Sequence, residues 1–260
     1  MRPNPLLDSI RSSRPAVGVW LSTPSSVTAE VAARVGFDYA CVDMQHGLIG
    51  YSDAVPMLQV LTLGGATPTV RVPWNEPGII GKVLDAGAMA VIVPMVNTPE
   101  DAAAAMASGK YAPEGSRSSG PIRVAPVEGP EYAEVANEHV QIIPMVETVE
   151  AVANIDAILS TPGVEAIYVG PADLAVSMGL GRGTSDPSFF EQLDHIVARC
   201  GEHGVTPGIH CFPHTIEGHL ERGFRMVTAQ SDLGAMTAGL TGALSHARGE
   251  SIDADTSSGY

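Results

Sequence analysis

Two carboxylates stand at the ends of apolar runs in the sequence. Glu147 ends the run QIIPMVE, and Asp173 ends the run IYVGPAD. If these runs are adjacent strands of a parallel sheet, the two side chains converge at one edge of it. Two carboxylates with open coordination positions suit a hard cation such as Mg²⁺ or Mn²⁺. Both residues also stand where a helix could begin, which favours carboxylates, so the spacing alone leaves a metal site and a pair of helix caps as alternatives.

A histidine and an arginine occupy comparable positions. His46 follows the run YACVDM, and an imidazole with a pKa of about 6.5 can take up a proton at neutral pH. The alternative is a loop histidine without a role. Arg71 interrupts the run TVRVP, where a charged side chain needs a partner. That partner is either a substrate carboxylate, which a guanidinium binds as a fork, or Asp43 at the end of the neighbouring run.

Further polar and aromatic residues complete this set. The side chains at or just after the ends of the apolar runs are Trp20, Asp43, Gln45, His46, Arg71, Glu147, Asp173, His210 and Asp232. His210, His214 and His219 are spaced closely enough to suggest zinc. Pro213 lies among them, however, so they cannot share one helical face. The sequence therefore favours the two carboxylates as metal ligands and leaves His210 as a pocket wall.

Such side chains meet only if the elements that carry them are suitably arranged. Short β-branched runs alternate with Ala-rich amphipathic stretches. The predicted strands are residues 17–21, 39–44, 69–72, 91–95, 141–146, 166–169, 207–210 and 226–229, and the predicted helices include residues 27–35, 53–63, 77–86, 99–108, 149–159 and 187–203. Alternating strands and helices form parallel βαβ units, and eight units in about 230 residues fit a closed (β/α)8 barrel of TIM type. A Rossmann-type sheet is the alternative, but no GxGxxG follows the first strand to support it.

The active site of such a barrel lies at the carboxyl ends of its strands, so the side chains above would share one face. Residues 111–129 (YAPEGSRSSGPIRVAPVEG) are rich in Gly, Pro and Ser, and we expect a long loop after the fourth strand on that catalytic side. Residues 1–248 are predicted to form one barrel domain and residues 249–260 a polar C-terminal tail.

The composition limits the partners. The 260 residues are 45% hydrophobic and 17% charged, enough to bury a large core. The net charge of −15 repels nucleic acid, anionic lipid and, at long range, an anionic substrate, so an acid-binding site needs its own arginine or metal. The N-terminal residues lack the apolar core of a signal peptide and no apolar run could span a membrane, so we expect a cytoplasmic protein. Cys41, Cys200 and Cys211 show no CxxC spacing and are expected to be reduced thiols.

At six places the sequence resembles one known family. The motifs are VDMQHG (residues 42–47), VRVPWNEP (70–77), LDAGAMAVIVPMV (84–96), YAPEGSR (111–117), PMVET (144–148) and VGPADLAVSMG (169–179), all between about residue 17 and about residue 248. In these motifs the chain resembles the class II pyruvate aldolases of the HpcH/HpaI group, the hydroxyketoacid aldolases, and it is similar also to macrophomate synthase. GPADL after a strand, with ET upstream, is the most specific pair. The resemblance implies a barrel of the phosphoenolpyruvate/pyruvate-binding type.

The resemblance also implies an activity and roles for individual residues. It implies a divalent-metal-dependent lyase that cleaves or forms 4-hydroxy-2-oxo acids, using an aldehyde and pyruvate or oxaloacetate, through an enolate of metal-bound pyruvate, in the breakdown of aromatic compounds. Glu147 and Asp173 would bind Mg²⁺ or Mn²⁺, with Co²⁺ or Zn²⁺ as alternatives. Arg71 would bind the carbonyl side of pyruvate and stabilise the enolate, and His46 would be a base paired with Asp85 as the acid. Substrate contacts are further implied for Trp20, Gly170, Pro171 and the backbone NH of Ala172.

Two residues depart from the family's pattern, and three other functions stay open. The family often has Glu where Gln45 precedes the histidine, and Gln where Met145 stands two residues before Glu147. These changes affect the identity of the substrate more than the mechanism.

Lys82 and Lys110, the chain's lysines, both lie on helical stretches, which argues against an aldolase that forms a Schiff base. The alternatives are an oxaloacetate decarboxylase, a lyase for CoA thioesters, and a non-catalytic binding protein for small acids.

The position of Asp85 predicts an assembly. Asp85 ends the helical stretch before the fourth strand, at the amino-terminal face of a barrel, whereas His46 lies at the opposite face. A strand of about six residues, roughly 20 Å long, separates them. Asp85 therefore either caps its own turn through Gly87 or reaches the His46 of a neighbouring subunit. We expect the second, in a closed homo-oligomer, and the resemblance implies a hexamer built as a trimer of dimers.

Overall fold

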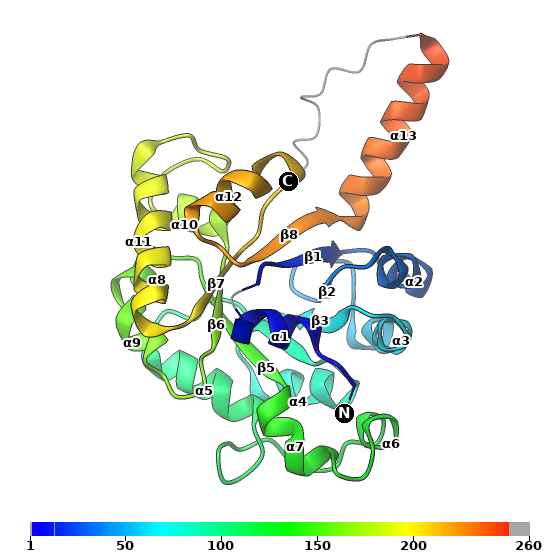
Figure 1. Cartoon of the computed structure of the whole chain (residues 1–260), viewed down its shortest axis with the longest axis vertical. Helices are drawn as coiled ribbons and strands as arrows, with labels where there is room; N and C mark the ends of the chain where they lie inside the picture. Colours follow the sequence, from blue (N-terminus) through cyan, green and yellow to red (C-terminus); the bar gives the residue numbers. More distant parts are fainter. Residues whose placement is uncertain (1, 13, 250–260) are drawn as a thin grey trace.

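The computed structural model describes residues 2–12 and 14–249. Within these residues eight parallel strands pair in chain order and close into a barrel, and helices surround it (Figure 1). The last strand returns to pair with the first, so the barrel has no open edge. The predicted (β/α)8 barrel of TIM type is confirmed, and the Rossmann-type alternative is wrong.

The strands lie where the apolar runs predict them, with ends that differ by one or two residues. They are β1 (Ala16–Leu21), β2 (Tyr39–Asp43), β3 (Thr67–Arg71), β4 (Ala90–Val93), β5 (Gln141–Val146), β6 (Ala166–Val169), β7 (Thr206–Ile209) and β8 (Met226–Ser231). The predicted fourth strand is too long at its end. Met95 has a φ of 57°, which is left-handed backbone that a strand does not contain, so β4 stops before it.

The helices follow the predicted alternation and add several short ones. They are α1 (Pro5–Ser12), α2 (Ser26–Val35), α3 (Tyr51–Leu63), α4 (Pro77–Asp85), α5 (Pro99–Gly109), α6 (Val124–Glu128), α7 (Tyr132–His139), α8 (Val149–Ala153), α9 (Ile155–Leu159), α10 (Pro171–Ser177), α11 (Pro187–His203), α12 (Ile216–Arg222) and α13 (Asp232–Arg248). The helix predicted at residues 149–159 is two helices. Asn154 breaks it, because its backbone leaves the helical conformation and its side-chain amide donates to the carbonyl of Asn97 at 2.9 Å.

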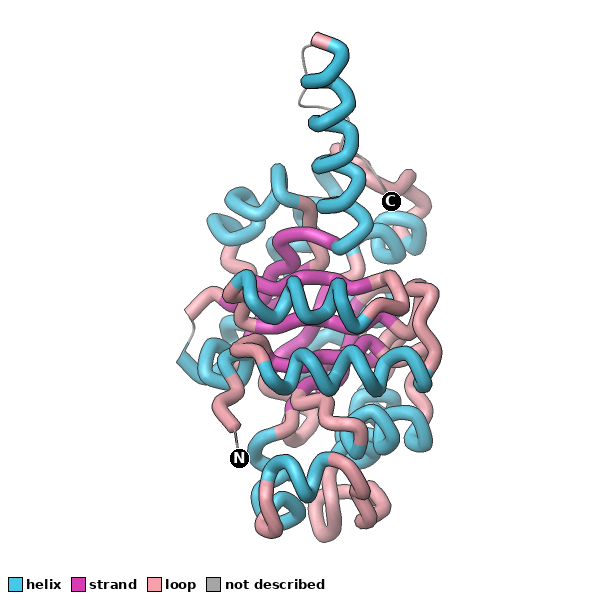
Figure 2. Tube along the Cα trace, turned by 90° about the vertical axis from the view of Figure 1, so that its right-hand side faces the viewer, coloured by secondary structure: helices cyan, strands magenta, loops and turns pink. Residues whose placement is uncertain are grey.

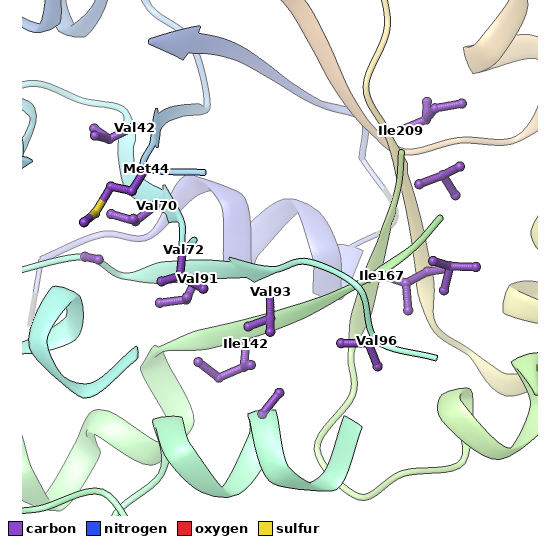
Figure 3. Packing of buried hydrophobic residues seen from close by; sticks show 14 of the residues in the cluster. Val42, Met44, Val70, Val72, Val91, Val93, Val96, Ile142, Ile167 and Ile209 are labelled. Atoms are coloured by element: carbon purple, nitrogen blue, oxygen red, sulfur yellow. The ribbon is translucent and has the colours of Figure 1, made fainter. Parts of the chain in front are cut away.

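Buried side chains form two layers, one inside the barrel and one between the strands and the helices. This follows from the two-residue period of a strand, which sends alternate side chains to opposite faces. The outer layer includes Val42, Val70, Val91, Ile142, Ile167 and Ile209 (Figure 3). The inner layer contains larger rings, and Gly18 makes room for one of them. A Cβ on Gly18 would lie 2.1 Å from Cζ of Tyr39, so the ring fits only against glycine.

The N-terminal helix closes one end of the barrel. Leu6 and Ile10 of α1 belong to the buried cluster inside the barrel, together with Tyr39. The backbone NH of Leu6 donates to Oγ1 of Thr67 on β3 at 3.0 Å, which ties the helix to the amino ends of the strands. The pocket described below opens at the other end, where the strands finish.

The loop predicted at residues 111–129 lies at the opposite face from the one expected. It connects α5 to β5, so it belongs to the amino-terminal face of the barrel and not to the catalytic side. The expectation was wrong because the loop follows the helix after strand four and not the strand itself. The end of this segment forms α6, and α7 follows it (Figure 1).

Two helices expose apolar side chains on one face. The last helix, α13, leaves the barrel after β8 and extends away from it (Figures 1 and 2). We call its exposed face the α13 stripe and a similar face on the barrel the α2 stripe; residues in each are three or four positions apart, as on one side of a helix. The α13 stripe consists of Leu233, Met236, Leu240 and Leu244, and the α2 stripe of Val27, Val31 and Val35.

The described chain forms one barrel, which covers most of the predicted domain. The polar tail predicted at residues 249–260 lies outside the described residues except for Gly249. None of the helices described here is long and apolar enough to cross a membrane.

Candidate active site

A pocket of about 820 Å³ opens at the carboxyl ends of the strands. Its wall includes each residue that the sequence analysis assigned to metal or substrate binding, whereas Asp85 does not line it. The predicted residues in the wall are Trp20, His46, Arg71, Glu147, Gly170, Pro171, Ala172 and Asp173. The closed barrel therefore brings together side chains that lie far apart in the sequence.

Glu147 lies directly after β5, and its carboxylate is buried. Its Oε1 accepts a hydrogen bond of 2.8 Å from the backbone NH of Met95. The left-handed backbone of Met95 is uncommon for a residue with a side chain, so the turn after β4 holds a costly conformation at the point where it contacts Glu147. Burial raises the pKa of Glu147; the hydrogen bond from Met95 opposes this rise and the charge of Asp173 adds to it. Ionisation of Glu147 is thus costly here unless positive charge lies nearby.

Gly170 leaves space beside Glu147. A Cβ on Gly170 would lie 2.4 Å from Oε2 of Glu147, so another residue type would displace the carboxylate. Gly170 precedes α10, and Asp173 stands in the first turn of that helix and lines the pocket. Asp173 therefore does lie at the start of a helix, as its place in the sequence suggested. Among the described residues, however, its carboxylate makes no hydrogen bond that would cap the helix.

The two carboxylates suit a divalent cation. Oε2 of Glu147 accepts no hydrogen bond from the described part of the protein, and the space beside it is kept open by Gly170. Within residues 2–12 and 14–249, no group of three or more His, Cys, Asp or Glu is arranged to hold a metal ion. Two carboxylates leave the remaining positions to water or substrate, as Mg²⁺ prefers. The zinc site considered from the sequence is therefore not formed, although His210, His214 and His219 all line the pocket.

Arg71 and Asp43 form a doubly hydrogen-bonded pair where β3 and β2 end. Nε of Arg71 lies 2.9 Å from Oδ1 of Asp43, and Nη2 lies 2.6 Å from Oδ2. Burial alone would raise the pKa of Asp43, but the hydrogen bonds and charge of Arg71 hold it below its ordinary value. Of the two partners that the sequence suggested for Arg71, the structure thus contains Asp43. It uses Nε and Nη2, and no acceptor in the described chain contacts Nη1, which leaves this nitrogen for a ligand.

Asp43 also shapes the loop that carries His46. Its Oδ1 accepts hydrogen bonds from the backbone NH groups of Gln45 at 3.0 Å and His46 at 3.3 Å. The His46 side chain is exposed and lines the pocket. Oε1 of Gln45 is buried and has no hydrogen-bond partner in the described structure. The residue that departs from the family's pattern therefore keeps an acceptor available next to the histidine.

Aromatic rings form the part of the wall around Arg71. The ring of Trp20 stacks on Tyr168 with centroids 5.7 Å apart and meets the ring of His210 edge-on at 4.9 Å. The Arg71 guanidinium lies 5.0 Å from the centre of the Trp20 ring. Burial, and then the charge of Arg71, lowers the pKa of His210 to about 4, so this imidazole is neutral at neutral pH. His210 is a pocket wall, as expected, and presents an uncharged hydrogen-bonding group.

The sequence did not reveal every residue of the site. Phe189, Phe190 and Phe212 line the pocket, but in the sequence they have the spacing of ordinary core residues. Met95 contributes a backbone NH to Glu147, and every residue type except proline carries that group. No sequence signal marks such a contact, because the fold and not the side chain creates it.

Asp85 lies at the last residue of α4, at the other end of the barrel. Its Oδ1 accepts a hydrogen bond of 2.6 Å from Nη2 of Arg117, on the loop after α5. Among the described residues its carboxylate makes no hydrogen bond to the turn at Gly87, so the turn-capping alternative is not what the structure contains. About a third of the Asp85 side chain is exposed, 32%. Within one chain Asp85 does not meet His46.

Asp232, another residue at the end of a predicted strand, has a structural role. Asp232 accepts hydrogen bonds of 3.0 Å from the backbone NH groups of Ser22 and Thr23, so it fixes the loop after β1. Neither Lys82 nor Lys110 lines the pocket, as expected for a site that does not form a Schiff base.

Comparisons with known proteins agree with this arrangement. The sequence profile of the family described as HpcH/HpaI aldolase/citrate lyase matches residues 16–238. The chain is 39% identical to the hydroxypyruvate/pyruvate aldolase of Rhizorhabdus wittichii over 238 residues, which are 90% of this chain and 95% of that protein.

Solved structures extend the likeness to the fold. A HpcH/HpaI aldolase/citrate lyase family protein from Burkholderia cenocepacia J2315 is 32% identical, with a TM-score of 0.89 that covers 95% of this chain and all, 100%, of the other. Macrophomate synthase is 26% identical, with a TM-score of 0.85 that covers 94% of this chain and 88% of the other. The matched region includes all eight strand ends around the pocket.

Proposed function

Because the chain belongs to the HpcH/HpaI aldolase/citrate lyase family, we propose a mechanism for its pocket from the chemistry of that family. The family and the aldolase at 39% identity make the protein a carbon–carbon lyase of the aldolase class. We propose that it cleaves 4-hydroxy-2-oxo acids to pyruvate and an aldehyde, or forms them from these products. The proposed cofactor is a divalent cation, Mg²⁺ or Mn²⁺, with Co²⁺ or Zn²⁺ as alternatives.

One observation carries this proposal: two carboxylates and one arginine converge in a single pocket, each with a polar atom that the described chain leaves without a partner. A 2-oxo acid has a carboxylate beside a keto oxygen, so it needs positive charge at two neighbouring points. Arg71 provides one charge, and a cation held by Glu147 and Asp173 would provide the other. The net charge of −15 makes such local positive charge necessary.

Glu147 and Asp173 are the proposed ligands of the cation, which when bound supplies a Lewis acid for the keto group of the substrate. Met95 holds Oε1 of Glu147, so Oε2 remains for the ligand role. The backbone NH of Ala172, in the first turn of α10, is proposed to bind the substrate carboxylate, since the NH groups at the start of a helix lack partners within it. Trp20, Gly170 and Pro171 are the proposed walls of this subsite.

Arg71 is proposed to act on the keto oxygen. Asp43 holds Nε and Nη2, so the guanidinium cannot rotate freely, and Nη1 can donate to an oxygen in the pocket. Negative charge grows on the keto oxygen when the carbon–carbon bond breaks. A preorganised cation stabilises that charge more in the transition state than in the substrate.

His46 is proposed to move the proton. In cleavage it removes the proton from the hydroxyl on C4. The C3–C4 bond then breaks, its electron pair passes to C3 and onto the keto oxygen, and the aldehyde leaves from C4. Protonation of C3 completes pyruvate, and synthesis follows the same steps in reverse.

This activity can be tested directly on the purified protein. After treatment with a chelator, it is incubated with pyruvate and glycolaldehyde, succinate semialdehyde or benzaldehyde, and separately with oxaloacetate, each with Mg²⁺, Mn²⁺ or no cation. We expect NMR to detect a new carbon–carbon bond only when a cation is present. Pyruvate release from oxaloacetate that is faster than in the same solution without protein, and without addition to any aldehyde, would instead establish the decarboxylase alternative.

The active form is proposed to be a homo-oligomer with a shared site. In one chain β2 separates the two faces on which His46 and Asp85 lie; its five residues span roughly 17 Å, too far for contact. Asp85 is part-exposed and can meet the His46 of a neighbour. The α13 stripe and the α2 stripe support a second contact between copies, because both expose apolar residues that a partner chain would cover. A hexamer, as a trimer of dimers, is the proposed assembly.

Mixing two inactive variants should restore activity if the site is shared. His46→Ala and Asp85→Asn subunits would each be strongly impaired alone. After subunit exchange at equal concentrations, about a quarter of the interfaces join an intact His46 to an intact Asp85, so about a quarter of wild-type turnover should return. Native mass spectrometry verifies the exchange, and an aldol assay measures the recovery.

The control for this mixing experiment uses residues of one pocket. His46→Ala mixed with Asp173→Ala should restore nothing, because both residues belong to the pocket of one chain and no single site in a mixed oligomer has both intact. A fully active monomer, or no recovery after verified exchange, would rule out the shared site.

A further inference from the structure

Arg117 is held in a fixed orientation on the loop after α5. Only 1% of its side chain is exposed. Its guanidinium lies 4.5 Å from the ring centre of Tyr111 and 5.6 Å from that of Tyr132. Nη1 and Nη2 each lie 3.2 Å from the hydroxyl oxygen of Tyr132 and can donate to it. Two rings and a hydroxyl therefore fix the plane of the guanidinium.

The acidic partner of this arginine is Asp85. Nη2 of Arg117 donates to Oδ1 of Asp85 at 2.6 Å. In the described part of the chain Arg117 pairs with no other carboxylate, and Asp85 receives no second donor. One oxygen of Asp85 is thus held from inside the protein, while 32% of the side chain faces solvent.

Burying the charged side chain of Arg117 costs free energy, which is hard to explain if the residue only holds the loop in place. A buried guanidinium is unfavourable unless hydrogen bonds replace its water. Here the replacement is incomplete, because Nε of Arg117 and the hydroxyl of Tyr111 are buried without a partner in the described structure. Apolar side chains could close the same loop without that cost. What an apolar side chain could not do is donate a hydrogen bond to the part-exposed carboxylate of Asp85, as Arg117 does.

We propose that Arg117 is a positioning residue that orients Asp85 toward the imidazole of a neighbouring subunit's His46. This inference rests on the proposed function, in which Asp85 completes the site of the neighbour. Arg117 occupies Oδ1, so that Oδ2 is left for the imidazole. A carboxylate in a defined orientation stabilises the protonated imidazole more than one that rotates, because the hydrogen bond is strong only when it is well aligned.

Arg123 offers a matched control on the same loop. Its Nη1 donates to the carbonyl of Ala86, the residue after Asp85, and its Nη2 donates to Oγ1 of Thr62 at 3.2 Å. Arg123 therefore ties the same turn to the loop without contacting the carboxylate. A variant of Arg123 disturbs the local structure but leaves the Arg117–Asp85 pair in place.

The test compares Arg117→Lys, Tyr132→Phe and Arg123→Met, each in the wild-type and the Asp85→Asn background. Arg117→Lys keeps the charge but loses the fork, and Tyr132→Phe loses only the hydroxyl, so it remains informative if the first variant folds poorly. The readouts are kcat, KM and the pH profile of kcat/KM for pyruvate with the fastest aldehyde of the panel, together with Tm and oligomer mass.

Arg117→Lys should lower kcat about tenfold with little change in KM. It should also move the acid limb of the pH profile to lower pH, because a poorly oriented carboxylate stabilises a positive charge on the imidazole less. Tyr132→Phe should change kcat and the acid limb of the pH profile in the same directions, by smaller amounts. Arg123→Met should lower Tm and leave the pH profile unchanged. In the Asp85→Asn background Arg117→Lys should have no further effect.

The outcomes separate this role from the shared site itself. If Asp85→Asn has wild-type kcat and pH profile, the shared site is wrong and the role of Arg117 is wrong with it. If Asp85→Asn is impaired while Arg117→Lys and Tyr132→Phe match the wild type in kcat and pH profile, only the positioning role is overturned. Equal losses from Arg117→Lys in both backgrounds would also overturn it, since the arginine would then act independently of Asp85.

Discussion

Replacing Asp173 with alanine should lower kcat/KM for the aldol reaction by about 10³-fold or more. Asp173 and Glu147 are the proposed protein ligands of the cation, so the change removes one of two carboxylates from the site. A Lewis acid stabilises the transition state by several kcal/mol, which corresponds to a factor of about 10³ in rate. Steady-state kinetics with Mn²⁺ measure the loss, and calorimetric titration with Mn²⁺ measures the accompanying loss of affinity.

Glu150 provides the matched control for this experiment. It is an exposed carboxylate in the first turn of α8, three positions after Glu147, and it does not line the pocket. Glu150→Gln should therefore leave both turnover and Mn²⁺ affinity unchanged. The Tm of Asp173→Ala should fall only slightly, since a carboxylate at a helix start contributes about 0.3–1 kcal/mol. Wild-type Mn²⁺ affinity in Asp173→Ala, or full turnover in chelator-treated enzyme, would show that the metal site is assigned wrongly.

Arg71→Lys should lower kcat by about 10²-fold. Lysine keeps a positive charge, but it cannot bond to Asp43 through two nitrogens and still present a third to the keto oxygen. The charge that develops in the transition state therefore loses its aligned donor, and removal of such a donor costs a factor of about 10² to 10³. Steady-state kinetics with saturating pyruvate and cation measure the effect.

A comparison of Tm with kcat separates the two roles of Arg71, because Asp43 is its structural partner. If Arg71 served only this pair, Arg71→Lys would lower Tm and would leave kcat close to that of the wild type. We expect Arg71→Lys to lose kcat far beyond what its change in Tm explains. A variant with lowered Tm and near-normal kcat would place Arg71 in a structural pair alone.

The barrel and the main site residues could be predicted from the sequence because short-range patterns encode them. Apolar runs bounded by polar residues mark strands, and the barrel places all strand ends on one face. Glu147 follows such a run directly, and His46 and Asp173 lie within four residues of a strand's end, so topology brings them into one pocket. Arg71 was predictable as a charge in an apolar run. The sequence did not show that Arg71 can pair with Asp43 and still have a nitrogen left for a ligand.

The remaining features depend on contacts between distant segments. The loop that holds Arg117 was expected on the catalytic face, because its Gly, Pro and Ser content marks a loop without marking which end of the barrel it covers. Its contact with Asp85 joins positions 32 apart, and no local pattern encodes that pair. The contact of Met95 with Glu147 joins positions 52 apart and is made by the backbone of Met95. Such contacts follow from the closed fold and not from residue type.

The separation of Asp85 and His46 to opposite ends of the barrel gives the proposed contact between copies a polarity. Each copy donates a carboxylate from one end and accepts one at the other. Two copies can therefore complete each other's sites if they lie antiparallel, whereas copies that point the same way would have to close into a ring to complete every site. In both arrangements a copy without a neighbour has an incomplete site, so dilution should reduce specific activity as the assembly dissociates.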